Sequence, residues 1–287
     1  MGFPYKTVGL HTRPNYPGIE DLTRQVHEWL KARGAKLIAV QDHLRVDNVE
    51  HVSREEFQDQ VEMVLVLGGD GTFLRAGRLS LKKHVPILGV NLGRLGFLTE
   101  ITIPELFPVL ERMDAGDVKY ETRNVLRARI MRGQEVLFED HVINDAVVSN
   151  TTIARLIEIE SQVNGNFLAL FKADGLIIAT PTGSTAYSLA AGGPIVFPTM
   201  EAIVMTPICP HSLNQRPLVV PDHLVISVHV QTPMTNCTLT LDGQIGRSLE
   251  ENEHIEIERS PLQLTIIKSP FMSYFDILKS KLRWAEG

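Results

Sequence analysis

An apolar run that ends in a glycine-rich turn constrains the fold of this chain most. Residues 61–67 read Val-Glu-Met-Val-Leu-Val-Leu and are followed by Gly-Gly-Asp-Gly at 68–71. Such a run fits a strand that is buried on both faces, as in a parallel sheet covered by helices. The glycines allow a tight turn and a close backbone approach. Residues 72–79 have the pattern of a helix, so the segment predicts a strand–turn–helix unit.

The acid in this turn, Asp70, needs a partner other than phosphate. The N-terminus of a helix attracts phosphate through its N–H groups and its dipole, and a carboxylate facing phosphate would repel it. A hydroxyl group or a metal ion is one candidate partner, and a role in capping the helix is the alternative. The turn matches neither common phosphate loop. No glycine precedes lysine, as the Walker A pattern requires, and Leu74 replaces the third glycine of the dinucleotide fingerprint.

Strands and helices alternate in the first part of the chain. We expect strands at 6–11, 36–40 and 85–90 and a helix at 19–30, with a polar stretch at 41–60. Thr102 and Glu105 have the spacing of a capping box, which predicts a helix that ends before Gly116. This alternation predicts a parallel α/β sheet.

The pattern changes near residue 118, where short segments with alternating or β-branched residues begin. Asn164-Gly165 is a hairpin signal between two of these segments. We therefore expect a Rossmann-like α/β domain at 1–118 and a mostly antiparallel β domain at 119–268, with a final helix at 271–284 that returns residues 269–287 to the first domain. The expected strands of the second domain include 153–160, 167–171, 224–230, 237–241, 254–258 and 262–268.

Composition narrows the classes of partner. The 287 residues carry a net charge of −6, so the chain lacks the excess of basic residues that is typical of proteins that bind nucleic acid or an anionic membrane. This balance favours a small-molecule ligand. Cys209 and Cys237 are far apart, which suits a reducing compartment, argues against a zinc site and predicts buried free thiols. The ten histidines show no metal-ligand spacing. No apolar run approaches the ~18 residues of a membrane-spanning helix, so we expect a cytoplasmic protein.

Two glycine-rich stretches suggest further loops of a site. Residues 91–99 read Asn-Leu-Gly-Arg-Leu-Gly-Phe-Leu-Thr, either a loop packed near the carboxyl ends of strands or a plain connector. Residues 172–194 are dense in glycine, alanine and small hydroxyl residues, which indicates either close packing against a ligand or a tight crossover from strand to helix. Gly-Ser-Thr-Ala at 183–186 is not a nucleophile elbow, so serine hydrolysis is discounted.

Two polar groups interrupt the β pattern. Asn144-Asp145 stands within an apolar run and needs partners. An amide can bind the edge of a base and a carboxylate can accept from ribose hydroxyls, although a loop-closing Asx turn is also possible. Asp242-Gly243-Gln244 has the pattern of a turn between strands.

Taken together, these motifs resemble those of the bacterial NAD kinase family. The matching segments are 68–72, 91–98, 144–145, 174–194, 207–211 and 242–244. The resemblance covers nearly the whole chain in the family's order. A GGDG turn also occurs in lipid kinases and phosphofructokinases, so the long motif at 174–194 is the specific part.

The resemblance implies a role for each matching position. Asp70 would take the proton from the adenosine ribose 2′-hydroxyl of NAD, with Gly71 beside it. Asn144 and Asp145 would bind the adenine and ribose side, although many relatives have Asn-Glu there, and Asp174 would contact the nicotinamide end. The remaining implied ligand contacts are Arg75, Arg155, Lys172, Thr182, Thr185, Ala186, Tyr187, Ser188 and Gln244.

The same resemblance implies an enzyme that uses NAD and ATP as substrates, with Mg²⁺ brought by the triphosphate. The domain at 119–268 would bind NAD, and a homodimer or homotetramer would form through it. Two alternatives remain at this point. One is a catalytically silent NAD(P) sensor, which intact Asp70 disfavours, and the other is a lipid or sugar kinase of the same superfamily, which the stretch at 174–194 disfavours.

Overall fold

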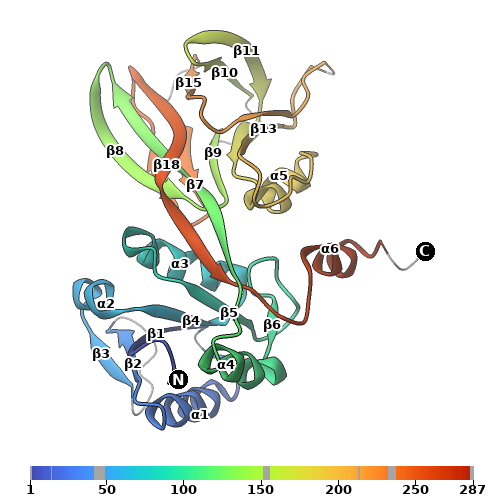
Figure 1. Ribbon diagram of the computed structural model, residues 1–287. Coiled ribbons are helices and arrows are strands. Elements are labelled where there is room, and N and C mark those ends of the chain that lie inside the picture. The colour runs from blue at the N-terminus through green and yellow to red at the C-terminus, as the bar shows by residue number, and fades with distance from the viewer. Residues whose placement is uncertain are drawn as a thin grey trace. The chain divides into compact units, whose positions relative to one another are not determined.

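The chain folds into two compact units, described here from a computed structural model (Figure 1). The structure describes residues 2–13, 15–41, 49–150, 156–212, 214–231 and 237–284. Unit 1 comprises Met1–Thr122 and Leu264–Gly287, and unit 2 comprises Arg123–Gln263.

Unit 1 is built on a parallel sheet in the order β18–β5–β4–β1–β2–β3, with β6 also paired to β5. Only the end of β18 takes part, through Ile266 beside Ile87. The strands of this sheet are β1 Thr7–Thr12, β2 Lys36–Val40, β3 Glu50–Val52, β4 Met63–Gly68, β5 Ile87–Asn91, β6 Ile101–Thr102 and β18 Glu253–Ile267. The helices of this unit are α1 Ile19–Lys31, α2 Arg54–Gln60, α3 Asp70–Ser80, η1 Leu81–Lys83, η2 Ile103–Glu105, α4 Leu106–Asp114 and α6 Tyr274–Leu282.

The predicted central strand is β4, which lies between β1 and β5. All six of its residues are buried, as expected for a strand covered on both faces. The capping box between Thr102 and Glu105 is present, and Gly116 has a φ of 78° just after α4. Strand β4 ends at Gly68, in the glycine-rich turn, and helix α3 begins at Asp70.

The polar stretch at 41–60 contains structure that the sequence analysis missed. It holds the three-residue strand β3 and helix α2. Ser53 caps α2 by accepting from the Glu56 N–H, and Glu56 reaches back to the Ser53 N–H. This capping box is a recognisable signal, but only Phe57 of α2 is buried, so the helix lacks a long apolar pattern.

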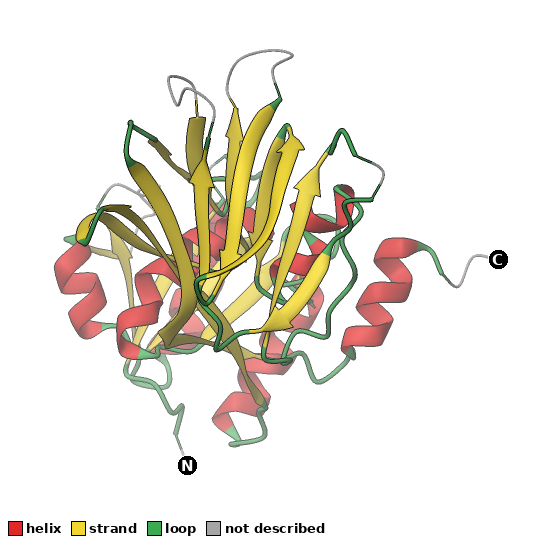
Figure 2. Cartoon of the chain, turned by 90° about the horizontal axis from the view of Figure 1, so that it is seen from above, coloured by secondary structure: helices red, strands yellow, loops and turns green. Residues whose placement is uncertain are grey.

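Unit 2 contains two antiparallel sheets, and strands predominate over helices in it (Figure 2, yellow and red). One sheet has the order β14–β13–β12–β9–β16–β17, and the other has β11–β10–β15–β18, with β7 paired to β18 and β8. Buried side chains from both sheets form its core. The remaining elements are β7 Tyr120–Arg132, β8 Glu135–Val142, β9 Asp145–Asn150, β10 Ile157–Val163, β11 Asn166–Ala173, β12 Gly175–Ala179, η3 Gly183–Thr185, α5 Tyr187–Ala190, β13 Ala202–Ile208, β14 Leu218–Pro221, β15 Ile226–Val230, β16 Cys237–Leu241 and β17 Ile245–Ser248.

A parallel α/β unit and an antiparallel β unit confirm the predicted fold class. The hairpin at Asn164-Gly165 joins β10 to β11, with φ values of 48° and 73°. The segments predicted as two strands at 254–258 and 262–268 are strand in the structure except for Lys268, but they are not separate. The backbone stays extended through Pro261, so both segments belong to the single strand β18.

The two cysteines differ in exposure. Cys237 is buried on β16, as expected, whereas Cys209 is exposed, which corrects the prediction of two buried thiols. Cys209 directly follows β13 and has a φ of 45°, so it lies in a turn and not in the sheet. Within the described ranges, no helix has the length and apolar character needed to cross a membrane.

Candidate active site

The glycine turn of unit 1 places Asp70 at the first residue of α3. A Cβ at Gly68 would lie 2.5 Å from Thr72 Oγ1, so the strand can turn this tightly into the helix only with glycine there. No side chain caps α3 at Gly69. The Asp70 carboxylate is instead directed at another loop.

That loop is the stretch at 91–99. Asp70 Oδ1 accepts from the Leu98 N–H at 3.0 Å, the Thr99 N–H at 3.1 Å and Thr99 Oγ1 at 3.0 Å, and Asp70 Oδ2 accepts from the Phe97 N–H at 2.9 Å. Gly96 lies so close that a Cβ there would be 2.0 Å from Asp70 Oδ1. The loop is therefore more than a connector, because it orients the carboxylate.

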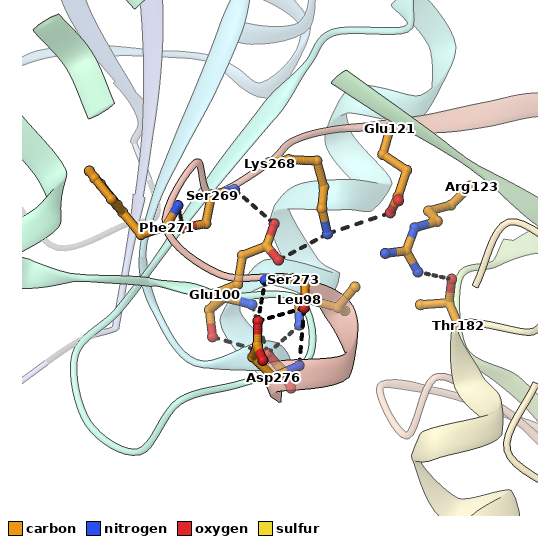
Figure 3. A network of polar contacts seen from close by, with 12 residues as sticks. Leu98, Glu100, Glu121, Arg123, Thr182, Lys268, Ser269, Phe271, Ser273 and Asp276 are labelled. Atoms are coloured by element: carbon orange, nitrogen blue, oxygen red, sulfur yellow. Dashed lines mark hydrogen bonds and ion pairs between the residues drawn. The ribbon is translucent and has the colours of Figure 1, made fainter. Parts of the chain in front are cut away.

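Polar contacts fix the loop at both of its ends. Asn91, the last residue of β5, accepts from the Gly93 N–H and donates to Thr99 Oγ1 at 2.9 Å. At the other end Glu100, which is 2% exposed, accepts from Lys268 Nζ at 2.9 Å and from the Ser269 N–H at 3.1 Å (Figure 3). These contacts hold the peptide groups that bind Asp70.

Lys268 has a second acidic neighbour in the same region. Lys268 Nζ also lies 3.6 Å from Glu121 Oε1, so one ammonium group stands between two carboxylates (Figure 3). The Lys268 side chain is 16% exposed and that of Glu100 is 3% exposed. Removal of one partner of such a buried ion pair lowers the stability of the fold, because the charge of the other partner stays buried without compensation.

The other predicted residues of unit 1 lie on the first turns of α3. Gly71 and Arg75 are both exposed and are four residues apart, so they share one face of the helix. Asp70, Gly71 and Arg75 thus form one group.

Unit 2 contains a pocket of about 410 Å³ around the predicted Asn144-Asp145 pair. Four of the predicted site residues line it, together with five that the sequence analysis did not assign to a ligand. The lining residues are Asn144, Asp145, Val147, Ser149, Ala186, Tyr187, Thr240, Asp242 and Gly243.

The Asn144-Asp145 pair lies at the step from β8 to β9 and is held on one side by Asp242. The Asp242 carboxylate accepts from the N–H groups of Ile143 at 3.2 Å, Asn144 at 2.7 Å and Asp145 at 3.1 Å. Asn144 Oδ1 is buried and has no hydrogen-bond partner among the described residues. Since buried polar atoms normally have partners, this atom is available to a ligand.

A segment after β12 holds the same pair on the other side. Thr180 Oγ1 donates to the Ile143 carbonyl at 2.7 Å, and the Thr180 N–H donates to the Asn144 carbonyl at 2.8 Å. A Cβ at Gly183 would lie 2.0 Å from the backbone carbonyl oxygen of Asn144. Several of the glycine and hydroxyl residues at 172–194 therefore serve internal packing.

The buried carboxyl group of Asp145 is electrostatically unusual. It is 5% exposed. The pKa of Asp145 is raised from 3.8 to about 7, first by burial and then by the nearby charge of Asp242, while the hydrogen bond from the Tyr187 N–H acts in the opposite direction. At neutral pH the group is present in both protonation states, so it can donate to or accept from a hydroxyl.

Other predicted residues lie on the segment at 182–188. Tyr187 is 48% exposed at the pocket. Thr182 is buried, and its Oγ1 accepts from Arg123 Nη1 at 3.4 Å (Figure 3), while Thr185 Oγ1 donates to the Thr182 carbonyl. Ser188 is fully buried and bonded to Thr206, so it supports the pocket wall without lining it.

The remaining predicted residues do not line this pocket. Lys172 is exposed on β11 and pairs with Glu158 at 2.6 Å. Asp174 is exposed between β11 and β12, and Gln244 follows Gly243 in the turn before β17. Arg155 lies outside the described residues.

From the sequence, Asp242 is predicted only as part of a turn, and its hydrogen bonds to residues 143–145 are not. The Asp-Gly pair between two strands does signal the turn, but nothing in the local pattern shows that the side chain reaches residues 143–145. Across the described parts of the chain, no group of three or more histidine, cysteine or acidic side chains is placed to hold a metal ion.

Comparison with known proteins identifies the class of this site. The family model described as the ATP-NAD kinase N-terminal domain matches residues 8–118, and that of the ATP-NAD kinase C-terminal domain matches residues 143–269. The fold and these two matches define a kinase.

Full-length relatives narrow the class. The chain is 44% identical to the NAD kinase of Solibacter usitatus over 98% of both chains, and 42% identical to that of Geotalea daltonii over 98% of this chain and 99% of the relative. This chain belongs to the NAD kinase family.

Solved structures share the fold. The yeast NADH kinase, complexed with NADH, superposes with a TM-score of 0.88 at 25% identity, covering 99% of this chain and 88% of that one. An NAD kinase from Archaeoglobus fulgidus in complex with ATP has a TM-score of 0.76 at 24% identity, covering 96% of this chain and 98% of that one.

Proposed function

We propose that this protein transfers the γ-phosphoryl group of ATP to the 2′-hydroxyl of the adenosine ribose of NAD, which yields NADP and ADP. One observation carries the proposal beyond family membership. A half-buried carboxylate, Asp70, is held by three peptide N–H groups and a hydroxyl at a strand-to-helix turn, where the helix N-terminus favours phosphate.

Asp70 acts as the general base in this proposal. Its Oδ1 accepts three of the four hydrogen bonds, whereas Oδ2 accepts only the one from Phe97 among the residues that the structure describes. A carboxylate oxygen that accepts one hydrogen bond still has a free lone pair, so Oδ2 retains a position for the ribose hydroxyl. A positioned base of this kind contributes about 10²–10⁴-fold to the rate.

Charge neutralisation supplies a further part of the catalysis. The transferred phosphoryl group carries charge on its oxygens, and part of this charge would be neutralised by the Mg²⁺ that accompanies the triphosphate. The N-terminal end of α3 and the exposed Arg75 guanidinium, one helical turn further along this helix, would provide additional positive potential. This chain's residues would orient the phosphates, and the metal would arrive with ATP.

The unit 2 pocket would bind the adenosine part of NAD. Asn144 Oδ1, buried without a partner among the described residues, fits as an acceptor for the adenine amino group. Asp145 would bind ribose hydroxyls, and the exposed ring of Tyr187 offers an apolar face to the dinucleotide. The positions implied only by the resemblance remain part of the proposal: Arg155, Lys172, Asp174, Thr182, Thr185, Ala186 and Gln244. Ser188 would act on the ligand only through the pocket wall that it supports.

We also infer a cytoplasmic homodimer or homotetramer that assembles through unit 2. The edge strand β11 supports this inference, because Phe167, Leu168 and Leu170 are 65%, 36% and 39% exposed. Apolar side chains exposed along a sheet edge favour association. A monomer in sedimentation at working concentration would contradict it.

The test of the activity is NADP formation by the purified protein from NAD, ATP and Mg²⁺. A dehydrogenase that accepts only NADP should detect product, and omission of Mg²⁺ or ATP should abolish it. Diacylglycerol and fructose 6-phosphate serve as control acceptors and should not be phosphorylated. Tight NAD binding without product would instead support a sensor.

A further inference from the structure

We propose that Asp242 is a positioning residue of the NAD site, whose carboxylate sets the backbone of residues 143–145 so that Asn144 and Asp145 face the dinucleotide. The inference rests on the proposed function, because it assumes that the unit 2 pocket binds NAD. Asp242 itself lines that pocket and is 8% exposed.

Both oxygens of Asp242 are needed for this role. Oδ1 accepts from the N–H groups of Asn144 and Asp145, and Oδ2 accepts from that of Ile143. The Asp242 N–H in turn donates to the Asp145 carbonyl at 2.8 Å. Three consecutive peptide groups at the step from β8 to β9 thus converge on one carboxylate, and its two oxygens share the three N–H groups.

The turn between β16 and β17 directs this side chain at the pair. Asp242 and Gly243 have φ values of 50° and 64°, so both residues adopt the left-handed conformation in the three-residue turn between Leu241 and Ile245. Aspartate and asparagine tolerate that conformation better than most residues. Asparagine at 242 should therefore preserve the turn while it changes the contacts.

Asp242 also controls the charge next to the ligand. The elements packed around Asp145 are β12, which places Ala179 opposite it, β16 and its turn, and α5 with the Tyr187 N–H. Of these, the charged group that faces Asp145 is Asp242, and it contributes to the raised pKa of that residue. Removal of this charge should lower the pKa of Asp145.

Asp242→Asn separates positioning from simple packing. Its amide keeps one oxygen and places an NH₂ group against a peptide N–H, so at least one of the three hydrogen bonds is replaced by two opposed donors. We expect NAD binding to weaken about tenfold. In wild type, the titration of Asp145 should produce an inflection of the NAD dissociation constant near pH 7, and in Asp242→Asn this inflection should move to lower pH.

The matched control is Asp222→Asn. Asp222 is another buried carboxylate of unit 2, bonded to Asn124 at 2.8 Å and to Arg259 at 3.3 Å, outside the pocket. Its replacement should lower stability but leave both the NAD dissociation constant and its pH inflection unchanged.

The experiment is calorimetric titration of the full-length wild type and variants with NAD from about pH 5 to pH 9. Unchanged affinity and inflection in Asp242→Asn, with wild type binding NAD and forming NADP, would overturn the positioning role alone. A wild type that fails to bind NAD would overturn the proposed function. If Asp242→Asn does not fold, Asp242→Glu serves instead: its shifted carboxylate should weaken binding while the inflection stays near pH 7, and wild-type affinity in it would contradict the proposal.

Discussion

Replacement of Asp145 by asparagine should stabilise the ligand-free protein, and the gain should grow as pH rises. The pKa of Asp145 is about 7 in the folded protein, above its ordinary value of 3.8. A carboxyl group whose pKa is raised on folding favours the folded state below its unfolded pKa, and this contribution is lost as pH rises through the folded pKa. Asparagine does not ionise, so the variant escapes that loss.

The size of the effect follows from the pH range between the unfolded and the folded pKa of Asp145. Between about pH 5 and pH 7 wild type keeps Asp145 largely protonated when folded and ionised when unfolded. Each pH unit in this range corresponds to about 1.4 kcal/mol, so the two units amount to about 3 kcal/mol. The stability of Asp145→Asn relative to wild type should therefore increase by about 3 kcal/mol from pH 5 to pH 8.

The assay is urea unfolding followed by far-ultraviolet circular dichroism. Tryptophan fluorescence does not suit it, because Trp29 and Trp284 both belong to unit 1. Glu251→Gln, an exposed substitution in unit 2, is the control and should show no such trend. A stability difference between Asp145→Asn and wild type that stays constant across this pH range would refute the assignment of a buried, titrating carboxyl group.

Two further substitutions test the contacts around Asp70. Gly96→Ala places a Cβ 2.0 Å from Asp70 Oδ1, so it should cost about 1–3 kcal/mol and reduce kcat, whereas Gly93→Ala, where the nearest atom is 3.9 Å away, should do neither. Lys268→Met leaves Glu100 buried without its cation and should cost about 3 kcal/mol or more, of which Glu100→Gln in the same chain should recover a part. Tryptophan fluorescence in urea measures both effects, and equal stability of all these variants would contradict the packing described.

The fold could be predicted from the sequence where local pattern and tertiary environment agree. The run that became β4 is apolar because both faces are covered, and the capping box at Thr102 is a purely local device. Short elements were missed because their stability comes from neighbours. Strand β3 has three residues at the edge of the sheet, and Pro261 did not break β18 because the strand is held along its length by other contacts.

The candidate site was predictable in its residue types but not in its internal contacts. The pattern at 68–71 identified Asp70 and a turn. Its hydrogen bonds to residues 97–99 connect positions 27–29 residues apart, and those of Asp242 to residues 143–145 span 97–99 residues. No periodicity or spacing in the sequence records contacts at such separations, because the sheets bring these loops together.

The rate of NADP formation by Asp70→Asn tests the central claim most directly. The amide keeps the size of the side chain and an oxygen for the loop at 91–99, but it cannot take the proton of the ribose hydroxyl. With NAD, ATP and Mg²⁺ saturating, kcat should fall by about 10²–10⁴-fold while NAD affinity, measured by calorimetry, stays close to that of wild type. A variant with near wild-type kcat would remove Asp70 as the base and contradict the mechanism.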